Sequence, residues 1–398
     1  MDEKWKFAKK VRTLGEPEVS YLKEVIDNGA LSHFDNENGY LMKFAKAFAQ
    51  YTGSKHAIPR CTGMTALAEA VGVSGASVGD EVLCDPIVHF GALAAAYFNA
   101  VPRFVDVDYD TYTMDPKSLE ANITDRTKAV IVTNLWGLMA EMDTIRDICN
   151  KHNLFLIEDC AHAMGSYWKE KHAGTYGDIG MFSFQEFKQL SSGDGGMMVT
   201  DNEKLAHDIT HKMAFSGESP LFFTMNYRMN EVTAALGLAQ LEKIDDILQN
   251  TYNKTLNILN DAVKDCKWLK NRIIPEGAVQ SGYWFACAWE GDKFDLDYNR
   301  FKKLNEELGI GLRFGFNQEA AYEFELFRES KLYGHPDCPA RCPLYTQKSD
   351  YKYQKGLCPT AEDLMPRLVT VNLIFMTIED AEKTAEKLRR AIQMIGRA

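Results

Sequence analysis

The chain has 398 residues with 45 Lys and Arg against 56 Asp and Glu, which gives a formal net charge of −11. This balance excludes nucleic acid as a partner, because the chain lacks the excess of cations that neutralises phosphates. A content of 45% hydrophobic and 25% charged residues is that of a globular protein and excludes disordered and fibrous classes. At about 100–200 residues per domain, the length predicts two domains, or one large domain with an appendage.

Hydropathy shows no run that approaches the roughly 18–20 apolar residues of a membrane helix. The first ten residues, MDEKWKFAKK, lack the apolar core of a secretory signal. The nine cysteines are an odd number scattered along a large chain, which is typical of free thiols in a reducing compartment. We therefore expect a cytoplasmic protein without membrane contact.

Three cysteines, Cys338, Cys342 and Cys358, lie near His335 and suggest a structural zinc site. Their C-x3-C spacing is looser than that of paired zinc knuckles, and three nearby prolines indicate an irregular loop. We therefore predict no metal site.

From about residue 43 to 200, helical patterns alternate with short apolar runs rich in β-branched residues, which predicts a parallel α/β sheet. The predicted strands are 81–84, 103–107, 128–133, 153–157, 180–184 and 196–200. The predicted helices between them are 65–73, 91–100 and 142–152.

A long periodic helix is predicted from about residue 230 to beyond 250, followed by a mixed pattern. That pattern contains a strand at 283–289, a helix at 297–308, an irregular stretch to about 360 and a helix at 379–394. We predict a large domain at 1–250 and a smaller α+β domain at 251–398, with a helical segment at 1–35 packing near the small domain.

Asp159 follows the apolar run LFLI, at the carboxyl end of a predicted parallel strand. Open α/β sheets bind their ligands at this edge, where a carboxylate needs a cationic partner. A helix N-cap is an equally good interpretation of this residue.

Lys188 lies in a polar loop before three glycines, Gly193, Gly195 and Gly196. Partial burial of such a lysine lowers its pKa and leaves neutral amine to attack a carbonyl, although a solvated loop lysine is the ordinary alternative. Taken with Asp159, it matches the needs of pyridoxal phosphate, which requires a lysine for the Schiff base and a carboxylate for the pyridine nitrogen.

Gly63 opens a predicted helix beside Thr62 and Thr65. The helix amides and the threonine hydroxyls there suit a phosphate group, and an ordinary helix cap is the alternative interpretation. No Walker or G-x-G-x-x-G pattern occurs, which argues against NTPases and dinucleotide enzymes. Arg228, next to Asn226 before the long helix, suits a phosphate, a carboxylate or a structural salt bridge.

Ordered sequence blocks from about residue 14 to the C-terminus resemble the DegT/DnrJ/EryC1/StrS family of sugar aminotransferases. They are GDEV with DP at 79–86, PRFVDVD at 102–108, EDCAHAMG at 158–165, FSFQEFK at 182–188, GDGG at 193–196 and NYRMNEVTAALGLAQLEK at 226–243. The resemblance implies a fold-type I enzyme that uses pyridoxal 5′-phosphate, with a mostly parallel central sheet flanked by helices and a smaller C-terminal α+β domain.

The resemblance also implies a role for each matched residue. Lys188 is the Schiff-base lysine and Asp159 the partner of the pyridine nitrogen, whereas Asn226 reaches the cofactor phosphate of a neighbouring subunit. A homodimer with shared active sites follows. The implied cofactor-binding residues are Gly63 and Met64 through their amides, Thr65 and Ser183 through hydroxyls, Phe90 through its ring, and Asp159, His162, Lys188 and Asn226.

Some positions depart from the family pattern. Met64 replaces a Thr, so Thr65 or Thr62 is expected to supply the missing hydroxyl. His89 stands where a Thr is usual, and Asn134 where a His is frequent. His162, in place of Gln near the ring hydroxyl, and Gln185 resemble the branches that act on cyclitols and form aminohydroxybenzoate.

The resemblance implies transfer of an amino group from glutamate or glutamine to a keto sugar or ketocyclitol, in amino sugar or aminocyclitol biosynthesis. One alternative is a dehydratase or aromatising enzyme of the same family. Sugar 3-dehydratases typically carry His at the lysine position, so Lys188 argues against that branch. A second alternative is a non-catalytic binding or regulatory homologue. Such a homologue would be recognised by the loss of Lys188 or Asp159, and both are present. The acceptor is not identified, although Arg313, Arg341, Lys352 and the stretch 322–360 are candidates for its recognition.

Overall fold

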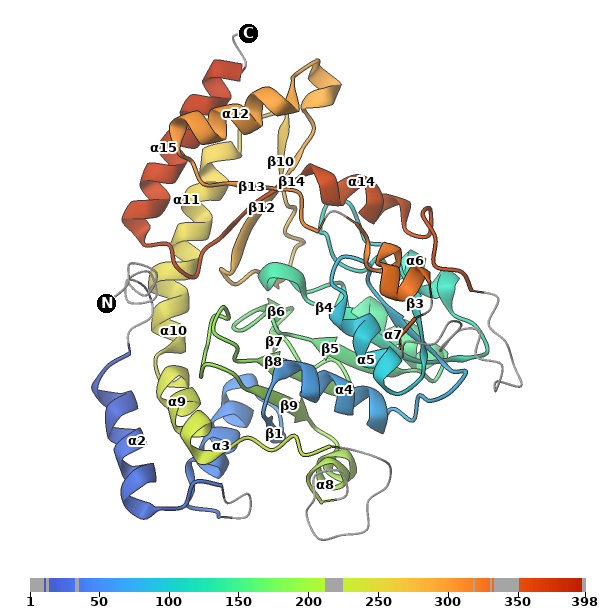
Figure 1. The fold of residues 1–398 in the computed structure, drawn as a ribbon, viewed down its shortest axis with the longest axis vertical. Helices are drawn as coiled ribbons and strands as arrows, with labels where there is room; N and C mark the ends of the chain where they lie inside the picture. Colours follow the sequence, from blue (N-terminus) through green and yellow to red (C-terminus); the bar gives the residue numbers. More distant parts are fainter. Residues whose placement is uncertain are drawn as a thin grey trace.

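A computed structural model describes residues 11, 14–32, 36–211, 225–317, 319–329, 331–332 and 351–395. A large body built on a central sheet carries a smaller body at one end (Figure 1). Cys338, Cys342, His335 and Arg341 lie outside the described residues. Among those described, no group of three or more His, Cys, Asp or Glu side chains could hold a metal ion. Each helix in this part of the chain is too short or too polar to span a bilayer.

The central sheet has seven strands in the order β1-β9-β8-β5-β4-β2-β3. In chain order they are β1 (His56–Arg60), β2 (Glu81–Cys84), β3 (Val101–Phe104), β4 (Thr127–Thr133), β5 (Phe155–Asp159), β8 (Ile179–Ser183) and β9 (Gly196–Thr200). The five strands from β3 to β8 are parallel, and β9 runs antiparallel to both β8 and β1. The predicted mostly parallel α/β sheet is thus confirmed. Its apolar strands are buried because helices flank the sheet on both faces.

The helices of the large body connect these strands or cover them. They are α3 (Tyr40–Thr52), α4 (Gly63–Val73), α5 (Phe90–Tyr97), α6 (Pro116–Asn122), α7 (Met142–Lys151) and α8 (Glu203–His211), with a short turn η2 (Leu135–Gly137). Helix α4 packs on β8 and β9, α5 on β2 and β3, and α7 on β5. The N-termini of α4 and α5 lie at the carboxyl ends of the parallel strands, because each helix follows a strand, β1 or β2, that ends at this edge of the sheet.

The long predicted helix begins as expected but is not continuous. Asn230 caps α9 (Glu231–Leu241), where its side chain accepts a hydrogen bond from the Thr233 amide. After a break come α10 (Ile244–Ile247), a π-helical turn η3 (Leu248–Tyr252) and α11 (Asn253–Val263). At this turn Gly282 approaches the backbone of Tyr252 so closely that a Cβ there would lie 2.3 Å from its carbonyl oxygen. The series leads from the large body into the small one (Figure 1).

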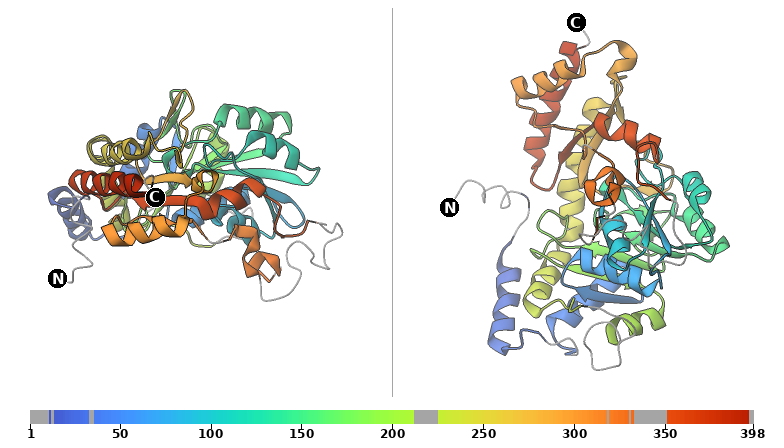
Figure 2. Two further views of the ribbon diagram at one scale, coloured as in Figure 1. Left: turned by 90° about the horizontal axis from the view of Figure 1, so that it is seen from above. Right: turned by 45° about the vertical axis from the view of Figure 1, so that its right-hand side comes forward.

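The small body is a four-stranded antiparallel sheet in the order β10-β12-β14-β13, covered by helices. Its elements are β10 (Leu269–Asn271), β12 (Trp284–Trp289), η4 (Gly291–Phe294), α12 (Tyr298–Leu308), β13 (Arg313–Phe314), β14 (Leu368–Asn372) and α15 (Ile378–Ile395). Figure 2 shows α11 and α15 side by side, and the two pack together over a core that includes Trp289, Phe301 and Leu388. A further three-stranded sheet joins β11 (Ala278–Val279), β6 (Tyr167–Trp168) and β7 (Lys171–His172).

We call the chain between β13 and β14 (residues 316–367) the return segment. It is described at residues 316–317, 319–329, 331–332 and 351–367, and these described parts pack on the large body. It contains η5 (Ala321–Glu323), α13 (Glu325–Arg328) and α14 (Pro359–Arg367). The rings of Tyr322, Phe327 and Tyr353 surround Phe104 at centroid distances of 5.1, 6.1 and 6.0 Å. These side chains share the core of the large body, and the division of the chain at residue 250 stays a prediction.

The position of the N-terminal segment 1–35 near the small domain stays a prediction, because only part of that segment is described. Its described helix, α2 (Glu16–Asn28), lies beside α9 of the large body and away from the small body (Figure 1). The buried Glu18 explains this position, because its carboxylate accepts a 2.6 Å hydrogen bond from Gln240 and pairs with Lys243. A buried carboxylate needs such partners, and the helix has to lie where they are.

Candidate active site

A cavity of about 320 Å³ opens at the carboxyl ends of β5 and β8, beside the N-terminus of α4. Six of the nine predicted cofactor-binding residues line it: Gly63, Met64, Phe90, Asp159, Ser183 and Lys188. Thr62 and Gln185 line it as well, whereas Thr65, His162 and Asn226 do not. The motifs that are far apart in sequence thus meet at one place, where open α/β sheets bind ligands.

Asp159 ends β5 and is only 2% exposed. Its carboxylate accepts a 3.0 Å hydrogen bond from the Ala161 amide. Burial raises the pKa of Asp159 to about 6, against the lowering effects of this bond and of Lys188. No helix follows residue 159, only a turn, so the N-cap interpretation does not hold. The carboxylate is ionised at neutral pH and faces the cavity.

Lys188 lies in the turn after β8, where its amide donates to the Gln185 carbonyl at 2.8 Å. Burial lowers the pKa of Lys188 to about 8, and the negative charge of Asp159 partly offsets this lowering. About one tenth of the amine is therefore neutral at pH 7. Its ammonium nitrogen lies 5.5 Å from the ring centroid of Tyr283. This is not the environment of a solvated loop lysine.

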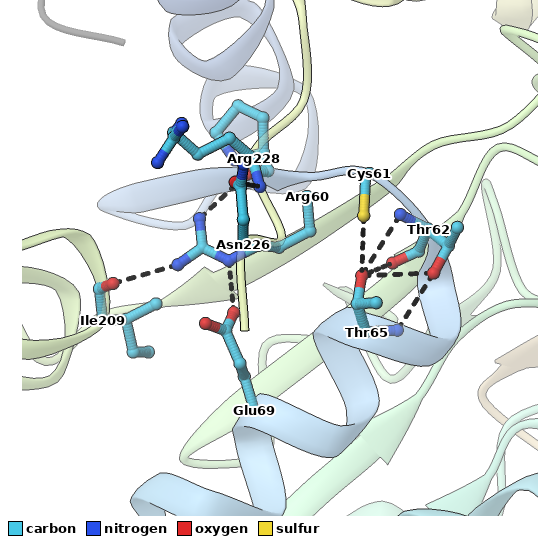
Figure 3. Close-up of polar contacts among 9 residues, drawn as sticks. Arg60, Cys61, Thr62, Thr65, Glu69, Ile209, Asn226 and Arg228 are labelled. Carbon is cyan, nitrogen blue, oxygen red and sulfur yellow. Dashed lines mark hydrogen bonds and ion pairs between the residues drawn. The ribbon is translucent and has the colours of Figure 1, made fainter. Parts of the chain in front are cut away.

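The N-terminus of α4 forms one end of the cavity. Thr62 caps the helix by accepting a 3.1 Å hydrogen bond from the Thr65 amide, and the Thr65 hydroxyl donates to the Thr62 carbonyl at 2.8 Å (Figure 3). Thr65 is therefore occupied in capping rather than turned to the cavity. A Cβ on Gly63 would lie 2.6 Å from the Cβ of Ser183, so glycine permits β8 to bring the Ser183 hydroxyl to the helix end. Free helix amides beside a hydroxyl fit a phosphate group.

Neighbouring polar groups at this end are already engaged. Arg60 and Glu69 form a buried ion pair, and Arg60 also donates to the Ile209 carbonyl at 2.9 Å (Figure 3). Asn226 is exposed, and its side chain accepts a 3.2 Å hydrogen bond from the Arg228 amide. Asn226 and Arg228 lie in the segment next to β1, outside the lining of this cavity.

Two aromatic residues lie next to the cavity, of which Tyr283 is absent from the sequence-based prediction of the site and Phe324 falls in the stretch 322–360 predicted for acceptor recognition. Tyr283 packs its ring 4.8 Å from that of His162, and Phe324 lies 5.7 Å from the ring of His89. His162 is half-buried, and its buried Nδ1 has no hydrogen-bond partner among the described residues. Desolvation lowers its pKa, so the imidazole is neutral. Both aromatics lie more than 90 residues from the motifs they contact, so no local spacing indicates them.

The sequence matches the model of the DegT/DnrJ/EryC1/StrS aminotransferase family over residues 12–348. The chain belongs to this family. It is 35% identical over 265 residues to GDP-perosamine synthase of Escherichia coli O157:H7, covering 63% of this chain and 71% of that protein. It is 37% identical over 251 residues to the L-glutamine:scyllo-inosose aminotransferase of Streptomyces griseus, covering 58% and 59%.

The solved aminotransferase of Psychrobacter cryohalolentis superposes with a TM-score of 0.81 at 23% identity, covering 96% of this chain and 98% of that one. This likeness confirms the fold-type I architecture. Against several curated relatives, the aligned stretch spans less than two thirds of their length. The resemblance that the sequence blocks indicate, and with it the aminotransferase class, is therefore confirmed, whereas the substrates remain to be proposed.

Proposed function

We propose that this family member is a pyridoxal 5′-phosphate-dependent aminotransferase that moves an amino group from glutamate or glutamine to a keto sugar or ketocyclitol. The observation that carries the proposal is the convergence of Lys188, Asp159 and the α4 N-terminus on one cavity. Few other chemistries need a lysine of lowered pKa, a buried carboxylate and a phosphate cradle together.

The residues fit the cofactor. The Gly63 and Met64 amides and the Ser183 hydroxyl are placed to bind its phosphate, and the close approach of Gly63 to Ser183 brings these donors together. Asp159 would hold the proton of the pyridine nitrogen, and Phe90 would cover a ring face. When bound, the cofactor supplies an aldehyde that condenses with amines and a ring that accepts electrons from the donor α-carbon.

The two catalytic residues divide the acid–base work. Lys188 has a pKa of about 8, so its amine can take a proton from the donor α-carbon and return it at the cofactor C4′ carbon. Asp159 has a pKa of about 6 and remains ionised at neutral pH, which favours a protonated pyridine nitrogen. In the second half of the reaction Lys188 moves the proton in the opposite direction, and the keto acceptor leaves as an amine.

The names of the relatives support two classes of acceptor. One is named for GDP-perosamine, a nucleotide-linked sugar, and another for scyllo-inosose, a ketocyclitol. Gln185 lines the cavity and His162 lies next to it as a neutral imidazole, and we infer from these two residues that the acceptor is a ketocyclitol. Retention of Lys188 disfavours the dehydratase alternative, and retention of Lys188 with Asp159 disfavours a binding protein without activity.

The cofactor assignment is tested by borohydride reduction of the protein loaded with pyridoxal phosphate, followed by peptide mass spectrometry. We expect the reduced cofactor on the peptide that contains Lys188, and none in the Lys188→Ala variant. The control is Lys171→Ala, which removes a lysine whose ammonium lies 5.1 Å from the Tyr176 ring, away from the cavity. Attachment to another lysine would overturn the assignment.

We also propose a homodimer whose active sites are shared. Asn226 is exposed and lies outside the cavity of its own chain, as a residue that acts in a second subunit would. Co-expressed Lys188→Ala and Asn226→Ala subunits should then regain about one quarter of wild-type activity, because half of the dimers carry one intact site of two. Activity that stays at the level of the separate variants would contradict the shared site.

A further inference from the structure

Gln189, the residue after Lys188, joins three parts of the chain. It is 2% exposed, and its amide oxygen accepts a 3.2 Å hydrogen bond from the Met164 amide. Its nitrogen lies 2.9 Å from the Ser281 hydroxyl and 3.0 Å from the Gly282 carbonyl. The turn that carries Lys188 is thereby tied both to the turn after Asp159 and to the chain that enters β12.

The Ser281 hydroxyl is part of a buried polar cluster. It lies 2.8 Å from the hydroxyl of Ser166, which in turn donates to the Gly137 carbonyl at 2.7 Å. The Ser281 amide donates to the same carbonyl at 3.0 Å, and both serines are fully buried. Gly137 has φ +82°, and a Cβ there would lie 1.9 Å from the Ser281 carbonyl oxygen. We call Gly137, Ser166, Gln189 and Ser281 the hub.

Tyr283 follows the hub by two residues and connects the two bodies. Its carbonyl accepts a 3.0 Å hydrogen bond from the Leu373 amide, just after β14 of the small body. Its ring is 4% exposed, 4.8 Å from His162 and 5.5 Å from the Lys188 ammonium, both in the large body. The ring position is therefore set by contacts from both sides of the domain boundary.

We propose that Tyr283 is a positioning residue for Lys188: its ring face holds the ammonium group whenever the lysine is not bonded to the cofactor. The hub fixes this ring at the domain boundary. The inference rests on the proposed role of Lys188 and adds the residue that controls its position and charge.

The physical basis is the attraction between a cation and the face of an aromatic ring within about 6 Å. The ring favours the charged lysine, as does Asp159, whereas burial favours the neutral amine. His162 is held neutral by its own burial and adds no charge. Removing the ring face while keeping an apolar side chain should therefore shift Lys188 toward the neutral form.

The test measures the pKa of Lys188 in the cofactor-free protein, from the pH dependence of its acetylation as followed by peptide mass spectrometry. Tyr283→Leu should lower that pKa by roughly half a unit, and Tyr283→Phe, which keeps the ring face, should leave it at the wild-type value. An unchanged pKa in Tyr283→Leu, or a raised one from entry of water, would overturn the proposal.

A matched control exists in the small body. The Lys302 ammonium lies 4.2 Å from the Tyr298 ring, so Tyr298→Leu removes the same kind of pair far from the cavity. It should leave the titration of Lys188 unchanged. Because the measurement uses neither cofactor nor substrate, failure of the aminotransferase proposal and failure of this inference give separate results.

The hub is tested with Ser281→Ala, which removes one hydroxyl without adding volume, and with Gln189→Leu. Both variants should lower the pKa of Lys188 by part of the shift expected for Tyr283→Leu. Both should also increase hydrogen exchange at residues 281–283. If Gln189→Leu does not fold, Ser281→Ala alone decides. A wild-type Lys188 pKa in a folded hub variant would overturn the role of the hub.

Discussion

The active site has two regions that are built in different ways: the sheet wall, which lines the cavity, and the crossing wall, which packs next to that lining. On the sheet wall, Asp159 and Ser183 end neighbouring strands of the central sheet and Gly63 begins the helix beside them. On the crossing wall, outside the cavity lining itself, Tyr283 contacts His162 and Phe324 contacts His89, and both come from chain that crosses between the two bodies. The predicted catalytic residue Asp159 thus rests on a rigid sheet, whereas the return segment that carries Phe324 can vary without disturbing it. Variants on the sheet wall should impair every substrate alike, and so should variants of Tyr283, which holds Lys188. Variants of Phe324 should discriminate between substrates.

The largest effect expected on the sheet wall, apart from loss of Lys188, is that of Asp159→Asn. The amide keeps an oxygen for the Ala161 hydrogen bond but loses the charge that favours a protonated pyridine nitrogen. We expect kcat to fall roughly 100-fold or more with any amino donor. Stopped-flow measurement of each half-reaction checks this, and a loss confined to one acceptor would contradict it.

The same variant should stabilise the cofactor-free protein. The pKa of Asp159 is raised from its ordinary value of 3.8 to about 6, so burying its charge costs stability above pH 6, and this cost disappears as the pH falls toward 4. Asp159→Asn should therefore unfold with a free energy higher by roughly 1–3 kcal/mol at pH 7.5 and by nearly nothing at pH 4. Urea denaturation of both proteins at the two pH values measures the difference.

A smaller effect is expected from Gly63→Ala. The new Cβ would lie 2.6 Å from the Ser183 Cβ, which forces β8 and the helix end apart. We expect cofactor affinity to fall roughly 10-fold, with about 1–3 kcal/mol lost in stability. The control is Gly15→Ala, where no atom lies within 4 Å of the added carbon. Equilibrium dialysis measures the affinity of both variants for pyridoxal phosphate. Equal affinities would show that the phosphate binds elsewhere than at Gly63.

The smallest effect is expected on the crossing wall, from Phe324→Leu. The return segment is held to the loop before Phe90 by the Ala321 amide, which donates to the Pro86 carbonyl at 2.9 Å, and Phe324 covers His89. We expect KM for the keto acceptor to rise roughly 3- to 10-fold while the half-reaction with the amino donor stays unchanged. Equal effects on the two half-reactions would contradict the distinction between the sheet wall and the crossing wall.

The sequence predicts the sheet wall well because its signals are local. Asp159 follows a buried apolar run, and Gly63 precedes a helical pattern, so each motif carries its own strand or helix end. The edge strand β1 is missed because Pro59 and Arg60 interrupt its apolar pattern. The hydroxyl of Thr65 takes part in the capping box of α4, and its predicted role at the phosphate stays a prediction, because a hydroxyl at a helix start suits both.

The crossing wall is predicted only in part: Phe324 falls in the stretch 322–360 expected to recognise the acceptor, whereas Tyr283 is missed. Tyr283 and Phe324 reach the site only through tertiary packing, and no spacing relates them to Lys188 or His89. The return segment likewise reads as part of the small domain because it lies between two of its strands. Its place on the large body depends on the aromatic cluster around Phe104 and on the Thr360 and Ala361 amides that bind Asp106.

The most direct test of amino transfer is the half-reaction without acceptor. Protein loaded with pyridoxal phosphate is mixed with glutamate or glutamine, and release of the corresponding keto acid is measured against the absorbance of the cofactor. We predict one equivalent of keto acid per site, with bleaching of the cofactor band, in the wild type and in Lys171→Ala, and none in Lys188→Ala. A Lys188→Ala protein that releases keto acid at the wild-type rate would contradict the assignment.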